Sequence, residues 1–193
     1  MKNNWFLVLI ISIVLFSISC AEKNASIEVL FQEDANDWFS DGDAEWSFVN
    51  DELMGTAQGA GGFVMTKKSY TDFILELEFK PDSTVNSGIF IRCKQKEISF
   101  SDCYELNIWD LHPKQENRTG AIVSRASPME KVETLDKWNT YKIRNHNDHL
   151  QVWINNIMMV DIEDNDLKEG PIALQAAESG KVVFRNVRLT VLN

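Results

Sequence analysis

The sequence has few basic residues and few cysteines for its length. Its 193 residues include 19 Lys and Arg against 29 Asp and Glu, a formal net charge of −10. A nucleic-acid-binding surface needs clustered Lys and Arg, so nucleic acid is excluded as a partner. Three cysteines are too few for a disulfide scaffold, and 9 Gly exclude a collagen-like chain. The absence of heptads excludes a coiled coil.

Several sequence motifs of known chemistry are also absent. The chain has no G-x-S-x-G, no H-E-x-x-H and no C-x-x-C pair. Its Gly-rich run at 59–62 precedes an apparent strand, whereas phosphate binding needs a helix there. What the chain does have is 44% hydrophobic and 10% aromatic residues, which argues against disorder. This composition and length suit one domain with a sizeable core.

The first twenty residues have the pattern of a secretion signal. Lys2 precedes an apolar stretch at 5–16, and the small-residue run 17–19 ends at Cys20. The apolar stretch is shorter than a bilayer span, which needs roughly 20 residues. A cysteine after small residues is typical of a bacterial lipoprotein, although Ser17 stands where such signals usually have Leu.

We therefore expect three segments. Residues 1–19 are the signal peptide, 20–26 are the lipidated Cys20 with a short tether, and 27–193 are the folded domain. The expected location is the bacterial cell envelope, on the periplasmic or outer-membrane face, with membrane contact only through the lipid. An uncleaved anchor or ordinary cleavage nearby are the alternatives. The oligomeric state stays open.

From residue 27 onward, apolar and polar residues alternate as in strands with one buried face. The pairs Asn147-Asp148 and Asn155-Asn156 suit tight hairpin turns. No segment has a convincing helical stripe, and 127–137 resembles a loop. The sequence predicts an all-β fold, an antiparallel β-sandwich. The clearest predicted strands lie at 73–79, 87–93, 104–109, 139–144, 150–154, 158–162, 171–175 and 182–191.

One predicted hairpin, 86–93 with 104–110, concentrates polar residues. Pairing like with like sets Ile91 opposite Leu106 and directs the aliphatic side chains inward. The other face carries two aromatic rings, which are seldom exposed together to bulk water. It also carries an Arg and a Glu, which are not buried without strong pairing. A half-open ligand cleft accounts for both, and the alternative is an Arg–Glu cross-strand salt bridge with incidental rings. The residues of that face are Phe90, Arg92, Glu105, Asn107 and Trp109.

Two further features of this hairpin leave alternatives open. Glu105, Asp110 and His112 together could hold a divalent cation such as Ca²⁺, or supply an acid and a base; no motif requires a cofactor. The like-with-like register sets Cys93 and Cys103 on opposite faces, which is poor geometry for a disulfide. A bulge would change that parity, and an oxidising compartment permits the bond, so both states stay open.

The order of motifs resembles the 3-keto-disaccharide hydrolase family, whose members have a concanavalin A-like lectin and glucanase jelly roll and are common as lipoproteins. The resemblance covers nearly all of the predicted domain, and its most specific segments are 86–92 and 104–110. It implies a jelly-roll fold. Further matching segments are 29–31, 46–53, 62–66, 70–73, 77–80, 119–122, 138–139, 152–155, 170–175 and 184–187.

This resemblance implies an enzyme that cleaves a 3-keto-glucoside or 3-keto-disaccharide, by hydrolysis or by elimination and hydration. A ketone at carbon 3 acidifies the hydrogen on carbon 2, and its removal lets the aglycone leave from carbon 1. We expect Glu105 to be the base and Arg92, or the metal, to stabilise the enolate. Substrate hydroxyls and a sugar ring are expected to contact Asn86, Asn107, Gln175, and Trp109 or Trp153.

The chain also departs from the family pattern. Asn107 stands where the family often has Gln, and Ala176-Ala177-Glu178 stands where many members carry Asp-His-Gly. If that His supplies chemistry in its relatives, the activity of this chain differs from theirs. The alternatives are a non-catalytic carbohydrate-binding module on the same fold and a structural lipoprotein that binds a protein partner.

Overall fold

A computed structural model describes residues 26–94 and 98–192. The predicted signal peptide and the lipidation site Cys20 lie outside these residues. The described residues contain no helix long and apolar enough to span a membrane. They form twelve strands and one short 3-10 helix, η1 (Gln115–Asn117): β1 (Ile27–Val29), β2 (Trp38–Gly42), β3 (Glu45–Val49), β4 (Glu52–Gln58), β5 (Gly62–Thr66), β6 (Phe73–Pro81), β7 (Val85–Ile91), β8 (Tyr104–Ile108), β9 (Asn139–His146), β10 (His149–Ile154), β11 (Ile157–Glu163) and β12 (Ala173–Val191).

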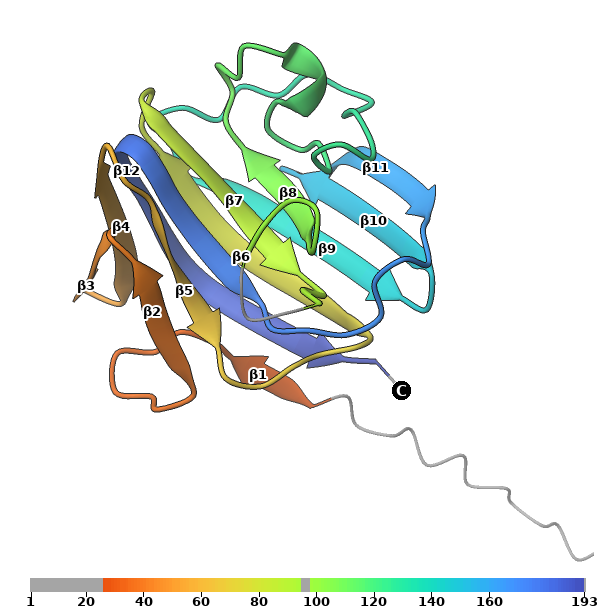
Figure 1. Ribbon diagram of the computed structural model, residues 1–193, viewed down its shortest axis with the longest axis horizontal. Helices are drawn as coiled ribbons and strands as arrows, with labels where there is room; N and C mark the ends of the chain where they lie inside the picture. The colour runs from red at the N-terminus through yellow and green to blue at the C-terminus, as the bar shows by residue number, and fades with distance from the viewer. Residues whose placement is uncertain (1–25, 95–97, 193) are drawn as a thin grey trace, which may run out of the picture.

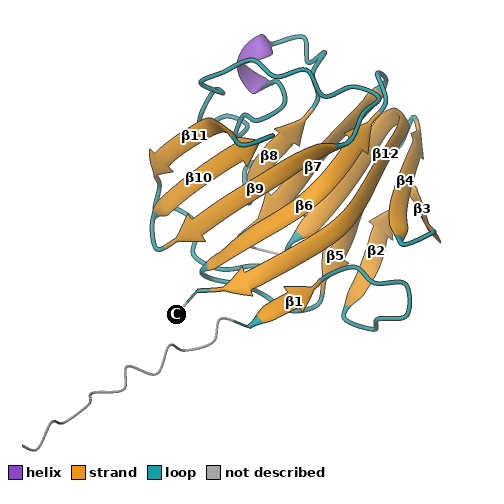
Figure 2. Ribbon diagram, turned by 180° about the vertical axis from the view of Figure 1, so that it is seen from behind, coloured by secondary structure: helices purple, strands orange, loops and turns teal. Residues whose placement is uncertain are grey.

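The strands form two antiparallel layers that face each other. One layer has the order β2-β5-β12-β7-β8 and lies toward the viewer in Figure 1. The other layer, which Figure 2 shows from its outer side, has the order β11-β10-β9-β6-β12-β4-β3, with β1 beside the end of β12. We call these the front layer and the back layer. The predicted β-sandwich is confirmed.

Strand β12 belongs to both layers and joins them. Its first part, 173–178, pairs with β5 and β7, and its second part, 179–191, pairs with β4, β6 and β1. The backbone passes between the layers at Glu178 and Gly180, with φ of 66° and 81°. A Cβ at Gly180 would lie 2.1 Å from the Oγ1 of Thr84, so only glycine fits at this crossing.

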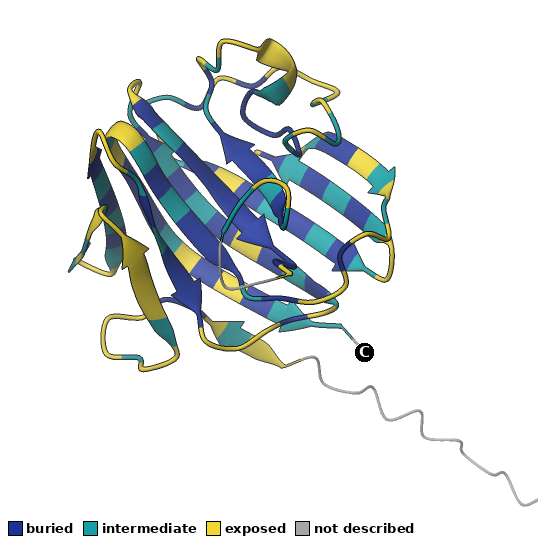
Figure 3. Ribbon diagram, in the orientation of Figure 1, coloured by how far each residue is buried: buried dark blue, intermediate teal, exposed yellow. Residues whose placement is uncertain are grey.

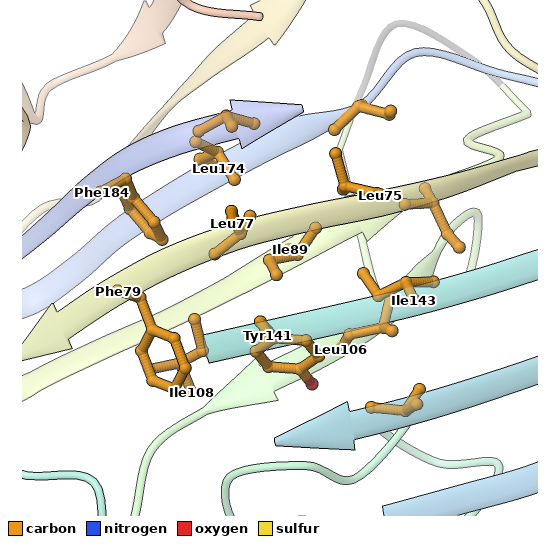
Figure 4. Packing of buried hydrophobic residues seen from close by; sticks show 14 of the residues in the cluster. Leu75, Leu77, Phe79, Ile89, Leu106, Ile108, Tyr141, Ile143, Leu174 and Phe184 are labelled. Carbon is orange, nitrogen blue, oxygen red and sulfur yellow. The ribbon is translucent and has the colours of Figure 1, made fainter. Parts of the chain in front are cut away.

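The core lies between the two layers. Alternation in β6 buries Phe73, Leu75, Leu77 and Phe79, as the sequence predicts. Side chains from the inner faces of both layers interdigitate, as Figure 4 shows for Ile89 and Leu106 of the front layer against the back layer. Figure 3 shows the result as alternating buried and exposed positions along the strands of the back layer.

Most predicted strands and both predicted turns are confirmed. Asn147 and Asn155 have φ of 56° and 51° in the turns after β9 and β10, which their short polar side chains tolerate. Residues 127–137 are a loop. Two strands predicted at 171–175 and 182–191 fall in the single strand β12, which begins at Ala173, because its backbone stays paired through the crossing.

The long connection between β8 and β9 covers one end of the sandwich and contains η1 (Figure 1). Strand β1 and the end of the described chain lie at the opposite end in both views. The domain thus has a loop-covered end and an end that carries its termini.

Candidate functional site

The outer face of the front layer carries side chains that alternate with the core residues of β7 and β8. Observed pairs are Phe90 with Glu105 and Gly88 with Asn107. The predicted register is therefore wrong by two residues. A shift of two keeps every side chain on its face, so the hydrophobic pattern could not detect the error.

A hollow of about 350 Å³ lies on this outer face, where β8 meets the loop-covered end. The structure brings five predicted residues together here, namely Asn86, Glu105, Asn107, Trp109 and His112. Sequence analysis missed the other lining residues, because they come from loops whose course no periodic pattern reveals. These are Phe100, Pro113, Lys114, Asn117, Val123 and Ser124.

Glu105 is the chemically distinctive residue of this hollow. Its backbone oxygen accepts a hydrogen bond from the Val123 amide at 2.9 Å, which fixes the strand. Its half-buried side chain forms no ion pair or hydrogen bond with any described residue, and burial alone raises the pKa of its carboxyl from 4.5 to about 7. A carboxyl with a pKa near neutrality can accept and return a proton in one cycle.

The loop beside Glu105 is held by Asn107 and by the His112 ring. The Asn107 amide nitrogen donates to the backbone oxygen of Asn117, and its side-chain oxygen accepts from the Ile108 amide at 3.0 Å. Asn107 thus already has protein partners, which leaves less of its amide for a substrate hydroxyl. The Nδ1 of His112 accepts from the Lys114 amide at 3.0 Å, and its ring packs edge-on against Trp109 with centroids 4.6 Å apart.

Arg92 does not share this face, and its predicted placement beside Glu105 is wrong. The strand ends at Ile91, and Arg92 has φ of 51°, which turns its side chain away. Its guanidinium donates to the backbone oxygens of Thr71, Asn147 and Leu167 at 2.7 to 3.2 Å and pairs with Asp72 at 2.8 Å. Only 1% of the residue is exposed, so Arg92 fastens loops together inside the domain.

The predicted metal set is not assembled either. Both carboxylate oxygens of Asp110 are taken, one by the amide of Thr134 at 2.6 Å and the other by its hydroxyl at 2.9 Å. Asp110 is 3% exposed and ties the β8–β9 connection together across 24 residues. The residues that the structure describes contain no group of three His, Cys, Asp or Glu fit to hold a metal ion. Glu105, Asp110 and His112 therefore do not form such a group.

The two remaining candidates lie outside the hollow. Trp153 is on the outer side of the back layer, with the Lys142 ammonium 5.7 Å from its ring centroid, so it cannot stack on a sugar held by Glu105. Gln175 is on the outer face of the front layer, two strands from β8. It therefore shares the face of Glu105 without lining the hollow.

Cys93 and Cys103 form a disulfide, which settles the open alternative. Both cysteines are buried with Met65, Phe90 and Ala173 on the outer face of the front layer. Ile98 of the connecting loop packs against this cluster, and Phe100 of the same loop reaches the hollow. The disulfide thus fastens one wall of the hollow to the sheet.

A larger cavity of about 490 Å³ lies near the end of the sandwich that carries β1. Its Arg185 and Asn186 are both engaged by Glu78, at 2.7 Å in each case. These polar groups hold the wall of the cavity together. We therefore place the candidate site at the smaller hollow, where Glu105 has no partner among residues 26–94 and 98–192.

The sequence profile of the 3-keto-alpha-glucoside-1,2-lyase-like domain matches residues 26–190. The chain belongs to this family. The family predicted from the order of motifs is thereby confirmed. Membership in the 3-keto-alpha-glucoside-1,2-lyase-like family implies a carbohydrate-active, glycosidase-like function. No curated protein sequence matches the chain.

Solved structures similar to this family member share its fold. A proposed glycosyl hydrolase from Parabacteroides distasonis is 20% identical with a TM-score of 0.72, over 86% of this chain and 100% of that one. The carbohydrate-binding module CBM66 from Bacillus subtilis is 17% identical with a TM-score of 0.63, over 79% and 94%. A Bacillus subtilis protein with a galectin-like fold is 15% identical with a TM-score of 0.60, over 86% and 94%. The neighbours thus include both proposed enzymes and binding modules on one architecture.

Proposed function

We propose that the protein is a lipid-anchored envelope enzyme that cleaves 3-keto-glucosides, with Glu105 as its base. The observation that carries this proposal is the lone carboxyl in the hollow, whose pKa burial raises to about 7. A structural carboxylate in a folded protein is normally paired or exposed, whereas this one is half-buried and has no partner in the part of the chain that the structure describes. Family membership supplies the substrate class.

The reaction needs one proton to be removed and one bond to break. Glu105 takes the proton from carbon 2, and the resulting charge is delocalised onto the oxygen of the 3-ketone. The electron pair then forms the carbon 1–carbon 2 double bond as the bond to the aglycone oxygen breaks. Protonated Glu105 can return its proton to that oxygen, and addition of water to the enone completes the hydrolysis.

The charged enolate oxygen needs a stabilising group, and Arg92 cannot supply it. Lys114 is the one Lys or Arg among the described residues that line the hollow. Its side chain is exposed, which leaves it free to move toward a bound substrate. We assign this electrostatic role to Lys114, and the sugar-stacking role to Trp109.

The proposed location agrees with two structural observations. The Cys93–Cys103 disulfide suits an oxidising compartment outside the cytoplasm. Strand β1 begins at Ile27, at the end of the sandwich away from the hollow (Figure 1). A tether that precedes β1 would hold the domain by that end and leave the hollow open to substrate.

A non-catalytic carbohydrate-binding module is the second candidate, and one observation favours it. Ala177 stands where many family members carry His, and it pairs with Asn86 of the hollow. Any chemistry that such a His performs in relatives is missing from this chain.

Incubation with a 3-keto-glucoside tests the proposal directly. We expect release of the aglycone above an enzyme-free control, and the same release in the presence of a chelator, since the three predicted ligands are not assembled. Binding of the glycoside without release would favour the binding module. Loss of release with chelator would show that a metal acts through residues other than this set.

A further inference from the structure

We propose that Gln175 and Phe63 form a second sugar subsite beside the hollow, which holds the leaving sugar of a disaccharide substrate. The inference rests on the proposed function and adds the residues that select a disaccharide over a glycoside with a small aglycone.

Strand register sets these two side chains level with the hollow. Gly88 pairs with Asn107 of β8, and Gln175 pairs with Phe63 of β5. Strands β12 and β7 pair on both sides of Gln175, through Leu174 with Ile89 and through Ala177 with Asn86. This register sets Gln175 level with Gly88. One row therefore crosses the outer face from the hollow through β7 and β12 to β5.

Gln175, on this row, has a side-chain acceptor without a hydrogen-bond donor among the described residues. Its side-chain oxygen is buried and has no partner among the described residues. A buried carbonyl without a partner is destabilising, so such groups normally have a function or a bound molecule. The oxygen is shielded from solvent as it stands, but the residue is half-buried, and rotation of the amide exchanges its oxygen with its nitrogen. A sugar hydroxyl is a donor that the rotated oxygen can accept from.

Phe63 supplies an apolar surface next to this oxygen. It is half-buried, and its ring meets buried Phe90 edge-on, with centroids 5.3 Å apart at 90°. This contact fixes the ring while part of it stays exposed. The C–H face of a sugar packs on an exposed aromatic face of this kind, and the adjacent Gln175 can take its hydroxyl.

The next row leaves room for a bulky ligand. Ala177 and Gly61 lie side by side there, so close that a Cβ on Gly61 would be 2.8 Å from the Cβ of Ala177. Neither has a side chain that rises above the sheet beyond a methyl group. The surface beside Gln175 and Phe63 is therefore low, and a ring lying over these two residues meets no obstacle from this side.

The spacing from Glu105 fits two linked rings. Strands β8 and β12 are separated by β7, so Glu105 and Gln175 are offset by two strand spacings, roughly 10 Å. Glu105 pairs with Phe90, which pairs with Ala173, so the two residues are also offset by two residues along the strand, roughly 7 Å. The side chain of Glu105 leans toward β7, since its Cγ lies 3.6 Å from the position of a Cβ on Gly88. When the carbon 1 substituent of a 3-keto ring at Glu105 points across β7, it lies over Gln175 and Phe63, and the proposal requires this orientation.

The test compares two substrates, a 3-keto-disaccharide and methyl 3-keto-α-glucoside, which lacks the second ring. We expect Phe63→Ala and Gln175→Leu each to lower kcat/KM for the disaccharide about tenfold, the cost of one stacking contact or one hydrogen bond. The methyl glucoside should be cleaved within about twofold of wild type. Trp153→Ala, on the back layer, is the matched control and should change neither rate.

Equal losses on both substrates, or no loss on either, would overturn the subsite. If the wild-type protein cleaves neither substrate, the proposed enzyme function fails, and the subsite is judged by calorimetric binding of the disaccharide. Weaker binding to both variants than to Trp153→Ala then supports it, and unchanged binding contradicts it. Gln175→Leu keeps the volume of the side chain, so it stays informative if Phe63→Ala does not fold.

Discussion

The β7–β8 hairpin carries two charged side chains whose surroundings are opposite. Arg92 is buried, and five hydrogen bonds tie it to Thr71, Asp72, Asn147 and Leu167. Glu105 is half-buried, and no described residue bonds to its carboxylate. The guanidinium of Arg92 is fully bound to other parts of the fold, and the carboxylate of Glu105 is available to a ligand. A charged side chain with protein hydrogen-bond partners is structural, and one without them is a candidate for catalysis. The residue type alone does not separate the two.

The largest expected effect on stability comes from replacing Arg92, whose charge is hydrogen-bonded within the protein. Replacing Arg92 by Met keeps much of the volume but removes the charged partner of Asp72 and one donor from each of three backbone oxygens. Asp72 keeps the Asn147 amide as a donor, and the Thr71 oxygen keeps Asn145. Because the Asp72 side chain is 22% exposed, we expect the free energy of unfolding to fall by about 2 to 4 kcal/mol, somewhat less than for a fully buried broken ion pair. Urea denaturation measures this loss.

Arg188→Met is the matched control, because Arg188 lies exposed on the back layer. Its free energy of unfolding should stay within about 0.5 kcal/mol of wild type. A comparable loss in both variants would contradict a special structural role for Arg92.

Replacing Glu105 should have the opposite effect and raise the free energy of unfolding. The folded pKa of Glu105 is raised to about 7 from 4.5, so the folded state binds this proton more tightly than the unfolded state. Stability is therefore lost as the pH rises from about 4.5 to 7. Glu105→Gln removes that loss, and above pH 7 we expect it to be more stable than wild type by up to about 3 kcal/mol.

Denaturation curves at pH 5 and pH 8 check this prediction. The advantage of Glu105→Gln should be small at pH 5 and larger at pH 8. Glu76→Gln, at an exposed position of β6, should show no such pH-dependent gain. If Glu105→Gln is less stable than wild type at pH 8, the carboxylate has a structural partner and the contrast with Arg92 fails.

The disulfide joins the two regions that this comparison separates, because Cys93 follows Arg92 and Cys103 precedes the strand of Glu105. Replacing both cysteines by Ala opens a loop with a sequence separation of 10. Loop-closure entropy then predicts a loss of about 3 kcal/mol in the free energy of unfolding. Thermal unfolding with and without reductant measures this loss. We expect the reductant to lower the unfolding temperature of the wild type and to leave that of the double variant unchanged. An unchanged unfolding temperature in both proteins would contradict the disulfide.

The smallest effect is expected on the far side of the molecule. Trp153→Ala removes an aromatic ring from the outer side of the back layer, whereas Trp109→Ala removes one from the hollow. We expect aglycone release to be unchanged within about twofold in the first variant, and reduced about tenfold in the second through lost stacking. Equal effects in the two variants would mean that the outer face of the front layer has no special part in binding.

Local patterns carried much of the fold prediction. Alternation identified β6, and the Asn pairs identified the turns around β10, because each feature depends on neighbours in the chain. Register was beyond this reach, since a shift of two residues buries the same side chains. The family resemblance and the polar face of β8 together brought Asn86, Glu105, Asn107 and Trp109 to one hollow.

The errors concern contacts between distant segments. The left-handed backbone of Arg92 and its partners at 71–72, 147 and 167 follow from how loops pack, which no periodicity encodes. Asp110 likewise finds its partner Thr134 in another part of the β8–β9 connection. In each case a charged residue that appeared free in the sequence is satisfied by backbone groups far along the chain.

Turnover by Glu105→Gln is the most direct test of the account. Gln keeps the shape of the side chain and cannot take a proton, so release of aglycone from a 3-keto-glucoside should fall at least about a hundredfold, the usual contribution of a general base. Calorimetric affinity for the same glycoside should stay within about threefold of wild type. If Glu105→Gln releases aglycone at close to the wild-type rate, Glu105 is not the base and the central claim is wrong.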